Sequence, residues 1–154
     1  MHTLYVMRHG QAESSAPSDE LRNLTPFGVE QVNLNARQNL SNKVFDYVFV
    51  SPYLRAQQTW DTIKQHQVTL KQCHTVDWIT PDVPTQPTLD NLVALEGESL
   101  SVLLVCHQTF AGRLSTHLCG GPSHGIHVDT AAIVHIETEV FASQCGTLIN
   151  IYAH

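Results

Sequence analysis

The stretch Leu4-Tyr5-Val6-Met7-Arg8-His9-Gly10 decides the fold of this chain. Its four apolar residues predict a buried β-strand that ends in an arginine, a histidine and a glycine. Gly10 lets the backbone turn and lets a ligand approach closely, while Arg8 and His9 offer a fixed cation and an imidazole. This order of strand, charge and turn is typical of α/β proteins that hold a reactive group at the edge of a sheet.

The same arrangement recurs at two later positions. Residues 47–50 form a short β-branched and aromatic run, after which Ser51 and a proline start a helix with Arg55 in its first turn. Because helical side chains lean towards the N-terminus of their helix, Arg55 should point back at the end of that strand. Residues 102–106 form another apolar run, which stops at His107. Three strands therefore each deliver one or two basic groups to their carboxyl ends.

If these strands are parallel neighbours, their basic groups meet in one crevice outside the sheet. Two arginines and two imidazoles, with no carboxylate fixed by the pattern, predict a pocket for a dianion. Phosphate is the first candidate, because guanidinium forks match its oxygens and the helix start after His107 adds amide donors. Taken singly, an arginine near a helix start is usually solvated and a histidine after a strand is usually a loop residue. The coincidence at three strand ends favours a site.

The composition limits the class of protein. A length of 154 residues, 42% hydrophobic and 14% charged, predicts one globular domain over residues 1–154. The formal net charge of −6 disfavours binding to nucleic acid or to an anionic membrane, so a local basic pocket must attract an anionic substrate. No stretch has the apolar length of a membrane span, and no secretory signal is recognisable.

Neither a metal nor another cofactor is expected. The four cysteines form no CxxC pair, which argues against a zinc ribbon and a thioredoxin motif. The simplest interpretation is that they are reduced thiols in a cytoplasmic protein. Some potential ligands surround a glycine-rich break but lack a metal-binding spacing: His117, Cys119, His124 and His127.

The periodicity along the chain predicts a single three-layer α/β/α sandwich with a mostly parallel central sheet and an antiparallel edge strand. Thr25 caps a helix that begins at Pro26, and three prolines mark residues 80–88 as an extended loop. The expected strands cover residues 3–9, 46–50, 68–76, 102–106, 131–137 and 147–152, the last two as an antiparallel pair. A loop is expected at residues 11–23, and further helices at residues 53–63, 89–95 and 110–118.

Four segments together carry a resemblance to a known family. They are Met7-Arg8-His9-Gly10-Gln11-Ala12-Glu13, Leu24-Thr25-Pro26-Phe27-Gly28, Val50-Ser51-Pro52-Tyr53-Leu54-Arg55-Ala56-Gln57-Gln58-Thr59 and the strand-terminal His107. In their order and spacing the chain resembles the histidine phosphatase superfamily, also called phosphoglycerate mutase-like, over nearly its whole length. Its short length and its Arg-His-Gly-x-Ala variant look most like the SixA branch, the small phosphohistidine phosphatases.

This resemblance implies roles for the residues at the strand ends. His9 would be the nucleophile that forms a phosphohistidine intermediate, while Arg8, Arg55 and His107 bind the phosphoryl oxygens and Gly10 lies against the substrate. His9 must present an unprotonated ring nitrogen, so its other nitrogen should donate to a backbone carbonyl or a similar acceptor. For His107 two states stay open: a cationic ring would clamp phosphate, and a neutral ring would donate one hydrogen bond.

The proton donor is not fixed by the pattern. Relatives that cleave phosphate monoesters usually carry a carboxylic acid that protonates the departing alkoxide, and here Gln108 stands where acid phosphatases have an aspartate. Asp82 and Asp19, both in expected loops, are the possible donors. Ser51 is expected to cap backbone groups, and Arg22 is left open as a contact for substrate or for an acidic partner.

A missing acid fits a substrate that is itself a phosphohistidine. Imidazole has a conjugate-acid pKa of about 6.5, so it leaves without the strong protonation that an alcohol requires. The resemblance implies a partner that carries phosphohistidine, either a histidine phosphotransfer domain of a bacterial signalling relay or a similar phosphocarrier, with inorganic phosphate as the product. Little material lies between the motifs for a lid, so the crevice should admit a protein, and we expect a monomer.

Two alternatives remain open. One is a phosphatase or mutase that acts on small-molecule phosphate esters, which a carboxylate within hydrogen-bond reach of a bound phosphate would favour. The other is a regulatory module that binds phosphate without turnover, which the presence of His9 together with both arginines makes the weaker alternative.

Overall fold

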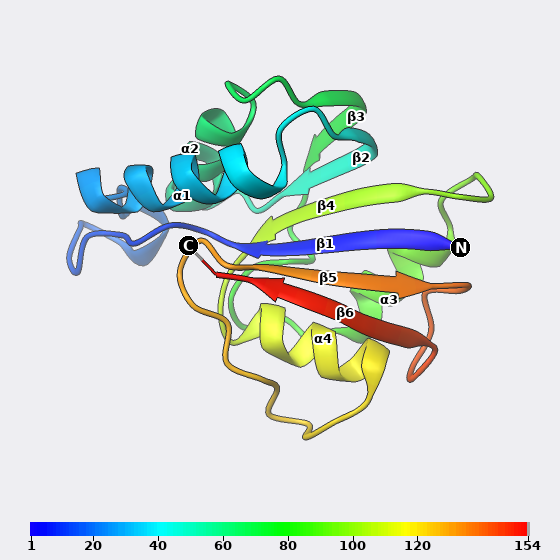
Figure 1. Cartoon of the computed structure of the whole chain (residues 1–154). Coiled ribbons are helices and arrows are strands. Elements are labelled where there is room, and N and C mark those ends of the chain that lie inside the picture. The colour runs from blue at the N-terminus through cyan, green and yellow to red at the C-terminus, as the bar shows by residue number, and fades with distance from the viewer. Residues whose placement is uncertain (154) are drawn as a thin grey trace.

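The computed structural model describes residues 1–153, and its six strands belong to one sheet in the order β3-β2-β4-β1-β5-β6 (Figure 1). In chain order the elements are β1 (His2–Arg8), the 3-10 helix η1 (Asp19–Leu21), α1 (Pro26–Asn39), β2 (Val44–Val50), α2 (Leu54–Ile63), β3 (Thr69–Thr75), α3 (Gln86–Val93), β4 (Ser101–Cys106), α4 (Phe110–Cys119), β5 (Ile133–Thr138) and β6 (Gly146–Tyr152).

Strands β1 to β4 are parallel, and their register aligns their carboxyl ends. Arg8 pairs with Cys106 across β1 and β4, and Val50 pairs with Val105 across β2 and β4. The residue that follows each strand therefore leaves the sheet at the same edge: His9, Ser51 and His107. The predicted convergence of three strand ends rests on this register.

The last two strands form the expected antiparallel pair. Strand β5 runs antiparallel to β1, and β6 runs antiparallel to β5, with an irregularity in their pairing between His135 and Ile136. Strand β6, at the edge of the sheet, thus runs in the same direction as the first four strands, and the reversed strand is its inner neighbour β5. The short connection over residues 139–145 accounts for this hairpin-like return.

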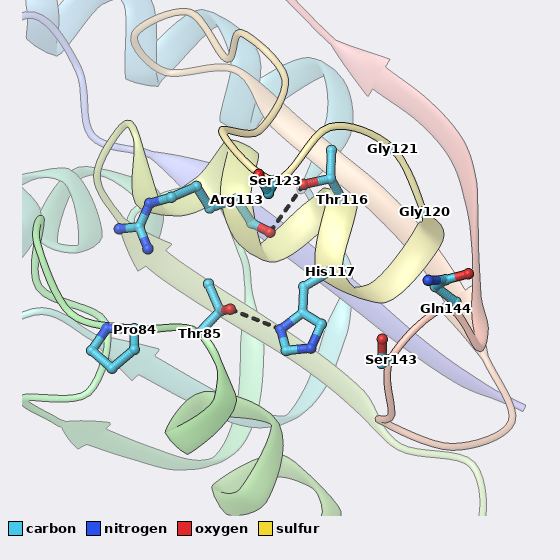
Figure 2. Close-up of a pocket in the computed structure, with 10 residues that line it drawn as sticks. All are labelled: Pro84, Thr85, Arg113, Thr116, His117, Gly120, Gly121, Ser123, Ser143 and Gln144. Carbon is cyan, nitrogen blue, oxygen red and sulfur yellow. Dashed lines mark hydrogen bonds between the residues drawn. The ribbon is translucent and has the colours of Figure 1, made fainter.

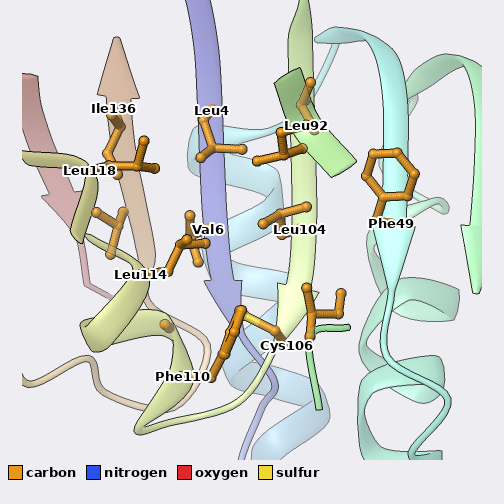
Figure 3. Packing of buried hydrophobic residues seen from close by; sticks show 14 of the residues in the cluster. Leu4, Val6, Phe49, Leu92, Leu104, Cys106, Phe110, Leu114, Leu118 and Ile136 are labelled. Atoms are coloured by element: carbon orange, nitrogen blue, oxygen red, sulfur yellow. The ribbon is translucent and has the colours of Figure 1, made fainter. Parts of the chain in front are cut away.

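Helices cover both faces of the sheet, as the three-layer prediction requires (Figure 1). Leu103 and Val105 of β4 pack in the layer of α1 and α2, whereas Val102 and Leu104 pack in the layer of α3 and α4. Figure 3 shows Leu104 in this second layer. Burial of such a side chain contributes about 1.5–3 kcal/mol. Because β4 is buried on both faces, its sequence is apolar at every position rather than at alternate positions.

One boundary prediction is wrong. Residues 86–88 were expected in the extended loop, but they form the first turn of α3, which ends at Val93 rather than at Leu95. Pro87 stands within the first two positions of this helix, where its missing N–H costs nothing and its fixed φ favours the helix. Proline there starts a helix instead of prolonging a loop.

The connection after β1 is more ordered than a plain loop. It contains η1, and Ala12 bridges to Leu24 in antiparallel fashion. At its end Thr25 accepts a hydrogen bond from Gly28 N at 2.9 Å, which is the predicted cap of α1. Within residues 1–153, none of the helices combines the length and the apolar character needed to cross a membrane.

Candidate active site

His9 is the centre of the site at the carboxyl end of β1. Its side chain is 6% exposed, its Nδ1–H donates to Gly10 O at 2.7 Å, and its Nε2 accepts a hydrogen bond from Arg55 Nε at 3.1 Å. Burial first, and then the nearby charges of Arg55 and Arg8, lower the pKa of His9 to about 3 against the opposing effect of the hydrogen bond to Gly10. His9 is therefore neutral at physiological pH and carries a lone pair on Nε2, which matches the expected backbone acceptor for its other nitrogen.

Arg55 reaches this nitrogen from the first turn of α2. The side chain is 4% exposed, and the ring of Tyr53 lies 5.0 Å from its guanidinium carbon. Besides His9, it contacts Asp19: Nη1 donates to the backbone oxygen at 2.6 Å, and Nη2 donates to Oδ2 at 3.2 Å. The guanidinium plane thus joins the strand end, the start of α2 and the segment of η1.

Arg8 supplies the second cation. Its Nη1 donates to Val128 O at 3.0 Å, and its buried Nε has no hydrogen-bond partner within the described residues. Burial has the largest effect and lowers the pKa of Arg8. The charge of Asp129 opposes this effect, and the charge of Arg55 adds to it. The charge of Arg8 also lowers the pKa of His9 and of His107, which puts the cation within electrostatic range of both rings.

His107 follows β4 and is 1% exposed. Its ring centroid lies 5.2 Å from that of His9 and 5.0 Å from that of Tyr53. Its Nε2 lies 2.7 Å from Ser51 Oγ, and its buried Nδ1 has no partner in residues 1–153. Burial has the largest effect on the pKa of His107, and His9 and Arg55 also lower it, to about 2 in total. The ring of His107 is therefore neutral as well.

The backbone around Gly10 explains the glycine. A Cβ there would lie 2.5 Å from Gly28 O, so only glycine lets the first turn of α1 approach this segment. The Gly10 N–H donates to Thr59 Oγ1 at 3.2 Å, and Thr59 donates to Arg55 O at 2.8 Å. Gly10 therefore ties His9 to the helix that carries Arg55, while its contact with a substrate stays a prediction.

Comparison with known proteins identifies the family. Residues 4–76 match the model of the histidine phosphatase superfamily, branch 1. The chain is 36% identical over 126 residues to the phosphohistidine phosphatase SixA homolog of Haemophilus influenzae, covering 76% of this chain and 77% of that protein. The chain belongs to the histidine phosphatase superfamily.

Further relatives agree with this assignment. Over 120 residues the chain is 33% identical to the phosphohistidine phosphatase SixA of Escherichia coli, covering 77% of this chain and 74% of the relative. A solved structure of the protein histidine phosphatase SixA complexed with tungstate is similar with a TM-score of 0.83 and 28% identity, covering 98% of this chain and 96% of that chain. The resemblance inferred from the four motifs is confirmed, and this superfamily member is an enzyme.

The structure places the two possible proton donors differently. Asp19 lies between two guanidinium groups, 2.9 Å from Arg22 Nη1 and 3.2 Å from Arg55 Nη2. The hydrogen bond from Arg22, and then that from Arg55, lower the pKa of Asp19 against the opposing effect of its partial burial. Asp19 is thus an anion in this state, which favours an ion-pair role over proton donation.

Asp82 is exposed on the loop that precedes α3. Burial raises the pKa of Tyr53, and the charges of Glu20, Asp19 and Asp82 raise it further. Asp82 therefore lies within electrostatic range of the site. Arg113 holds this loop, because its Nη1 and Nη2 donate to the carbonyls on either side of Asp82, those of Val83 and Pro81, at 3.0 and 3.1 Å.

A cavity of about 400 Å³ lies on the other side of this loop, along α4 (Figure 2). Its one guanidinium among the described residues, Arg113, is engaged with the loop carbonyls, and His117 Nδ1 lies 2.7 Å from Thr85 Oγ1. The cavity is lined by no member of the His9 site. Within residues 1–153, no three His, Cys, Asp or Glu side chains are grouped so that they could hold a metal ion.

Two side chains of the site were not identified as such from the sequence. Ser51 was expected only to cap the backbone, and it does accept from Tyr53 N at 3.3 Å, but it also contacts His107. Its place directly after β2, equivalent to those of His9 and His107, was the available signal. Thr59 is the last residue of a segment that carries the family resemblance, but its role depends on the approach of Gly10 from 49 residues away.

Arg22 was left open as a contact for substrate or partner. In the structure it pairs with Asp19 and thereby belongs to the ion-pair cluster that also includes Arg55. Its guanidinium is thus engaged on the η1 side of the site.

Proposed function

We propose that this protein removes phosphate from a phosphohistidine on another protein, through a phosphohistidine formed at His9. One observation carries the proposal: His9 is a buried neutral imidazole whose Nδ1–H is fixed on Gly10 O, so its Nε2 lone pair faces the guanidinium of Arg55. A fixed lone pair beside cations is what attack on a phosphoryl dianion requires.

The first step transfers the phosphoryl group from one imidazole to another. The hydrogen bond from Arg55 Nε to His9 Nε2 breaks when substrate binds, and the freed Nε2 lone pair forms a bond to phosphorus as the P–N bond of the substrate breaks. The electron pair of the broken P–N bond goes to the departing ring nitrogen. A substrate ring protonated on its other nitrogen leaves as neutral imidazole, so no enzyme acid is needed. Arg8, Arg55 and His107 stabilise the phosphoryl oxygens during this transfer.

The second step is hydrolysis of the intermediate. Water adds its oxygen to phosphorus as the bond to His9 Nε2 breaks, and the proton of the water goes to the solvent. Inorganic phosphate is released and His9 returns to the neutral state with Nδ1–H on Gly10 O. The sum is phosphohistidine plus water giving histidine plus phosphate.

Three further observations support a phosphohistidine substrate. Asp19 is held as an anion by Arg22 and Arg55, so it is a poor acid for a departing alkoxide. The relatives of 33–36% identity are named as phosphohistidine phosphatase SixA proteins. A related SixA binds tungstate, a tetrahedral oxyanion like phosphate.

The partner that we propose is a histidine phosphotransfer domain of a bacterial signalling relay, acted on in the cytoplasm by a monomer of this protein. Asp19, which pairs with Arg55, and Asp82 are exposed residues, so the segments next to the site are accessible to the surface of a partner protein. Inorganic phosphate is the expected product.

The test is incubation with a phosphotransfer domain phosphorylated on histidine. The wild-type protein should release phosphate and should form an acid-labile, alkali-stable phosphoenzyme, whereas His9→Ala should do neither. His74→Ala, which removes an exposed histidine of β3, is the matched control and should behave as wild type. Much faster cleavage of sugar or glycerate phosphates would favour the ester phosphatase, and phosphate binding without turnover would favour the regulatory module.

A further inference from the structure

Ser51 and His107 form a buried pair whose hydrogen-bond direction matters for the site. Ser51 is fully buried, His107 is 1% exposed, and the distance from Oγ to Nε2 is 2.7 Å. A hydroxyl and a ring nitrogen can share a proton in either direction at this distance. The direction decides whether His107 Nδ1 carries a proton or a lone pair.

The neighbouring groups decide between the two directions. The Tyr53 N–H already donates to Ser51 Oγ at 3.3 Å, so one lone pair of the hydroxyl oxygen is used. If His107 Nε2–H also donated to this oxygen, the Ser51 O–H would have no acceptor among residues 1–153, and Nδ1 would keep an unmatched lone pair. If Ser51 donates instead, only the Nδ1–H is left without a partner. Leaving a buried polar group unmatched costs about 1–3 kcal/mol, so the second arrangement is favoured.

We propose that Ser51 is a positioning residue that fixes His107 in the Nδ1–H tautomer, so that this ring donates to an oxygen of the phosphoryl group in transfer. The inference rests on the proposed function, because it assigns the unmatched Nδ1–H to the phosphoryl group held at His9. A lone pair on Nδ1 would repel that anion.

The two histidines of the site then have opposite tautomers. His9 is held by Gly10 O with its lone pair on Nε2, where it accepts a hydrogen bond from Arg55 until substrate binds. His107 is held by Ser51 with its lone pair turned away and its N–H available. The low pKa of His107, about 2, supports a neutral donor rather than a cationic clamp in the absence of phosphate.

Nitrogen NMR of the whole protein tests the tautomer without any phosphohistidine substrate. With 15N-labelled histidine, and with the His107 signals assigned by their loss in His107→Gln, the wild type should show a protonated Nδ1 and an unprotonated Nε2. Ser51→Ala should mix the two tautomers. Ser115→Ala is the matched control, since it also removes a buried serine hydroxyl, one that donates to Ala111 O at 2.7 Å, and it should leave His107 unchanged. A protonated Nε2 in the wild type, or an unchanged His107 in Ser51→Ala, would overturn the proposal.

Activity supplies a second readout. Ser51→Ala should lower kcat for dephosphorylation by about 10- to 100-fold, the scale on which an orienting partner of a functional histidine acts, and Ser51→Thr, which keeps the hydroxyl, should restore most of it. Thermal melting shows whether each variant is folded. If Ser51→Thr does not fold, the nitrogen NMR spectrum of Ser51→Ala tests the proposal in its place. If the wild type has no phosphohistidine phosphatase activity, the proposed function fails while the tautomer measurement still stands or falls by itself. Full kcat in a folded Ser51→Ala would contradict the role assigned to the hydroxyl.

Discussion

His9 and His107 have the same side chain, and the opposite tasks that we propose for them follow from the atoms around each ring. A backbone carbonyl faces Nδ1 of His9, whereas a serine hydroxyl faces Nε2 of His107. Both rings are neutral because burial disfavours the charged form. At the scale of single residues, the tautomer of each histidine therefore depends on its hydrogen-bond partner and not on the residue type.

Arg55 is the residue on which phosphate binding should depend most. Arg55→Ala should lower kcat/KM by about 10²–10³-fold, because it removes a preorganised donor and cation beside the reacting group. Arg55→Lys should also be severely impaired, since an ammonium cannot contact both His9 and Asp19 in one plane. Steady-state kinetics with a phosphohistidine domain measures both, with the exposed Arg37→Ala of α1 as the control. A loss of less than threefold in Arg55→Ala would contradict the pocket.

The lowered pKa values of His9 and His107 predict how stability changes with pH. Unfolded histidine has a pKa of about 6.5, so below that pH the unfolded chain binds protons that the folded chain does not. The free energy of unfolding should therefore fall as the pH drops from about 6.5 towards 3, by up to about 1.4 kcal/mol per pH unit for each histidine. Above pH 6.5 neither histidine contributes to the slope.

Urea unfolding between pH 4 and 6 measures this effect. The wild type takes up a proton on each of His9 and His107 when it unfolds, and His107→Gln lacks the second of these protons. Its free energy of unfolding should therefore depend less steeply on pH than that of the wild type, whatever its absolute stability. The exposed His124→Gln is the control and should keep the wild-type slope. Parallel curves for the wild type and His107→Gln would show that His107 is protonated in the folded state.

At the scale of elements, the contact between the start of α1 and the segment after β1 fixes the site. A Cβ on Gly28 would lie 2.1 Å from Gln11 O, so Gly28→Ala must push α1 away from the backbone that follows His9. In a free helix the same change would stabilise by about 1 kcal/mol. Here it should destabilise by about 1–3 kcal/mol, as overpacking does, and lower activity as well.

Thermal or urea unfolding shows whether Gly28→Ala stabilises or destabilises the protein. The control is Gln38→Ala, which changes an exposed residue of the same helix. Gln38→Ala should change the free energy of unfolding by no more than about 0.5 kcal/mol. A more stable and fully active Gly28→Ala would mean that the close approach of α1 is not needed.

At the scale of the whole molecule, a chain of net charge −6 holds a cationic pocket at one edge of its sheet. An oxyanion that binds only the folded state should stabilise it by about 2.7 kcal/mol at 100 times its dissociation constant. For a domain of this length the corresponding rise in Tm is about 5–10 °C. Tungstate and phosphate should both produce such a rise, because buried donors of Arg8 and His107 lack partners among the described residues.

Differential scanning fluorimetry measures this shift. Chloride at matched ionic strength should produce little change, since the overall charge of the protein does not attract anions. Arg55→Ala should lose most of the oxyanion effect. An equal rise with chloride, or an undiminished rise in Arg55→Ala, would place the stabilisation outside this pocket.

The sequence by itself predicted the architecture and four basic residues at the strand ends, of which the structure brings His9, Arg55 and His107 together. Apolar runs that end in basic residues can be recognised locally, since burial on both faces makes a central strand continuously apolar and the carboxyl ends of parallel strands share one edge. The resemblance to the family added the expectation of a nucleophile and of residues that bind phosphate, and these roles stay predictions. The start of α3 was missed because proline is common both in loops and in first helical turns.

Only the tertiary structure decided the protonation state of His107 and the contacts that surround the four basic residues. Arg55 meets Asp19 from 36 residues away, and His107 meets Ser51 from 56 residues away. Hydrogen bonds depend on distances of a few tenths of an ångström and on direction, which the packing of whole elements sets and which no local pattern encodes. For that reason the sequence could place His107 in the pocket, but it left open whether the ring is a cation or a neutral donor.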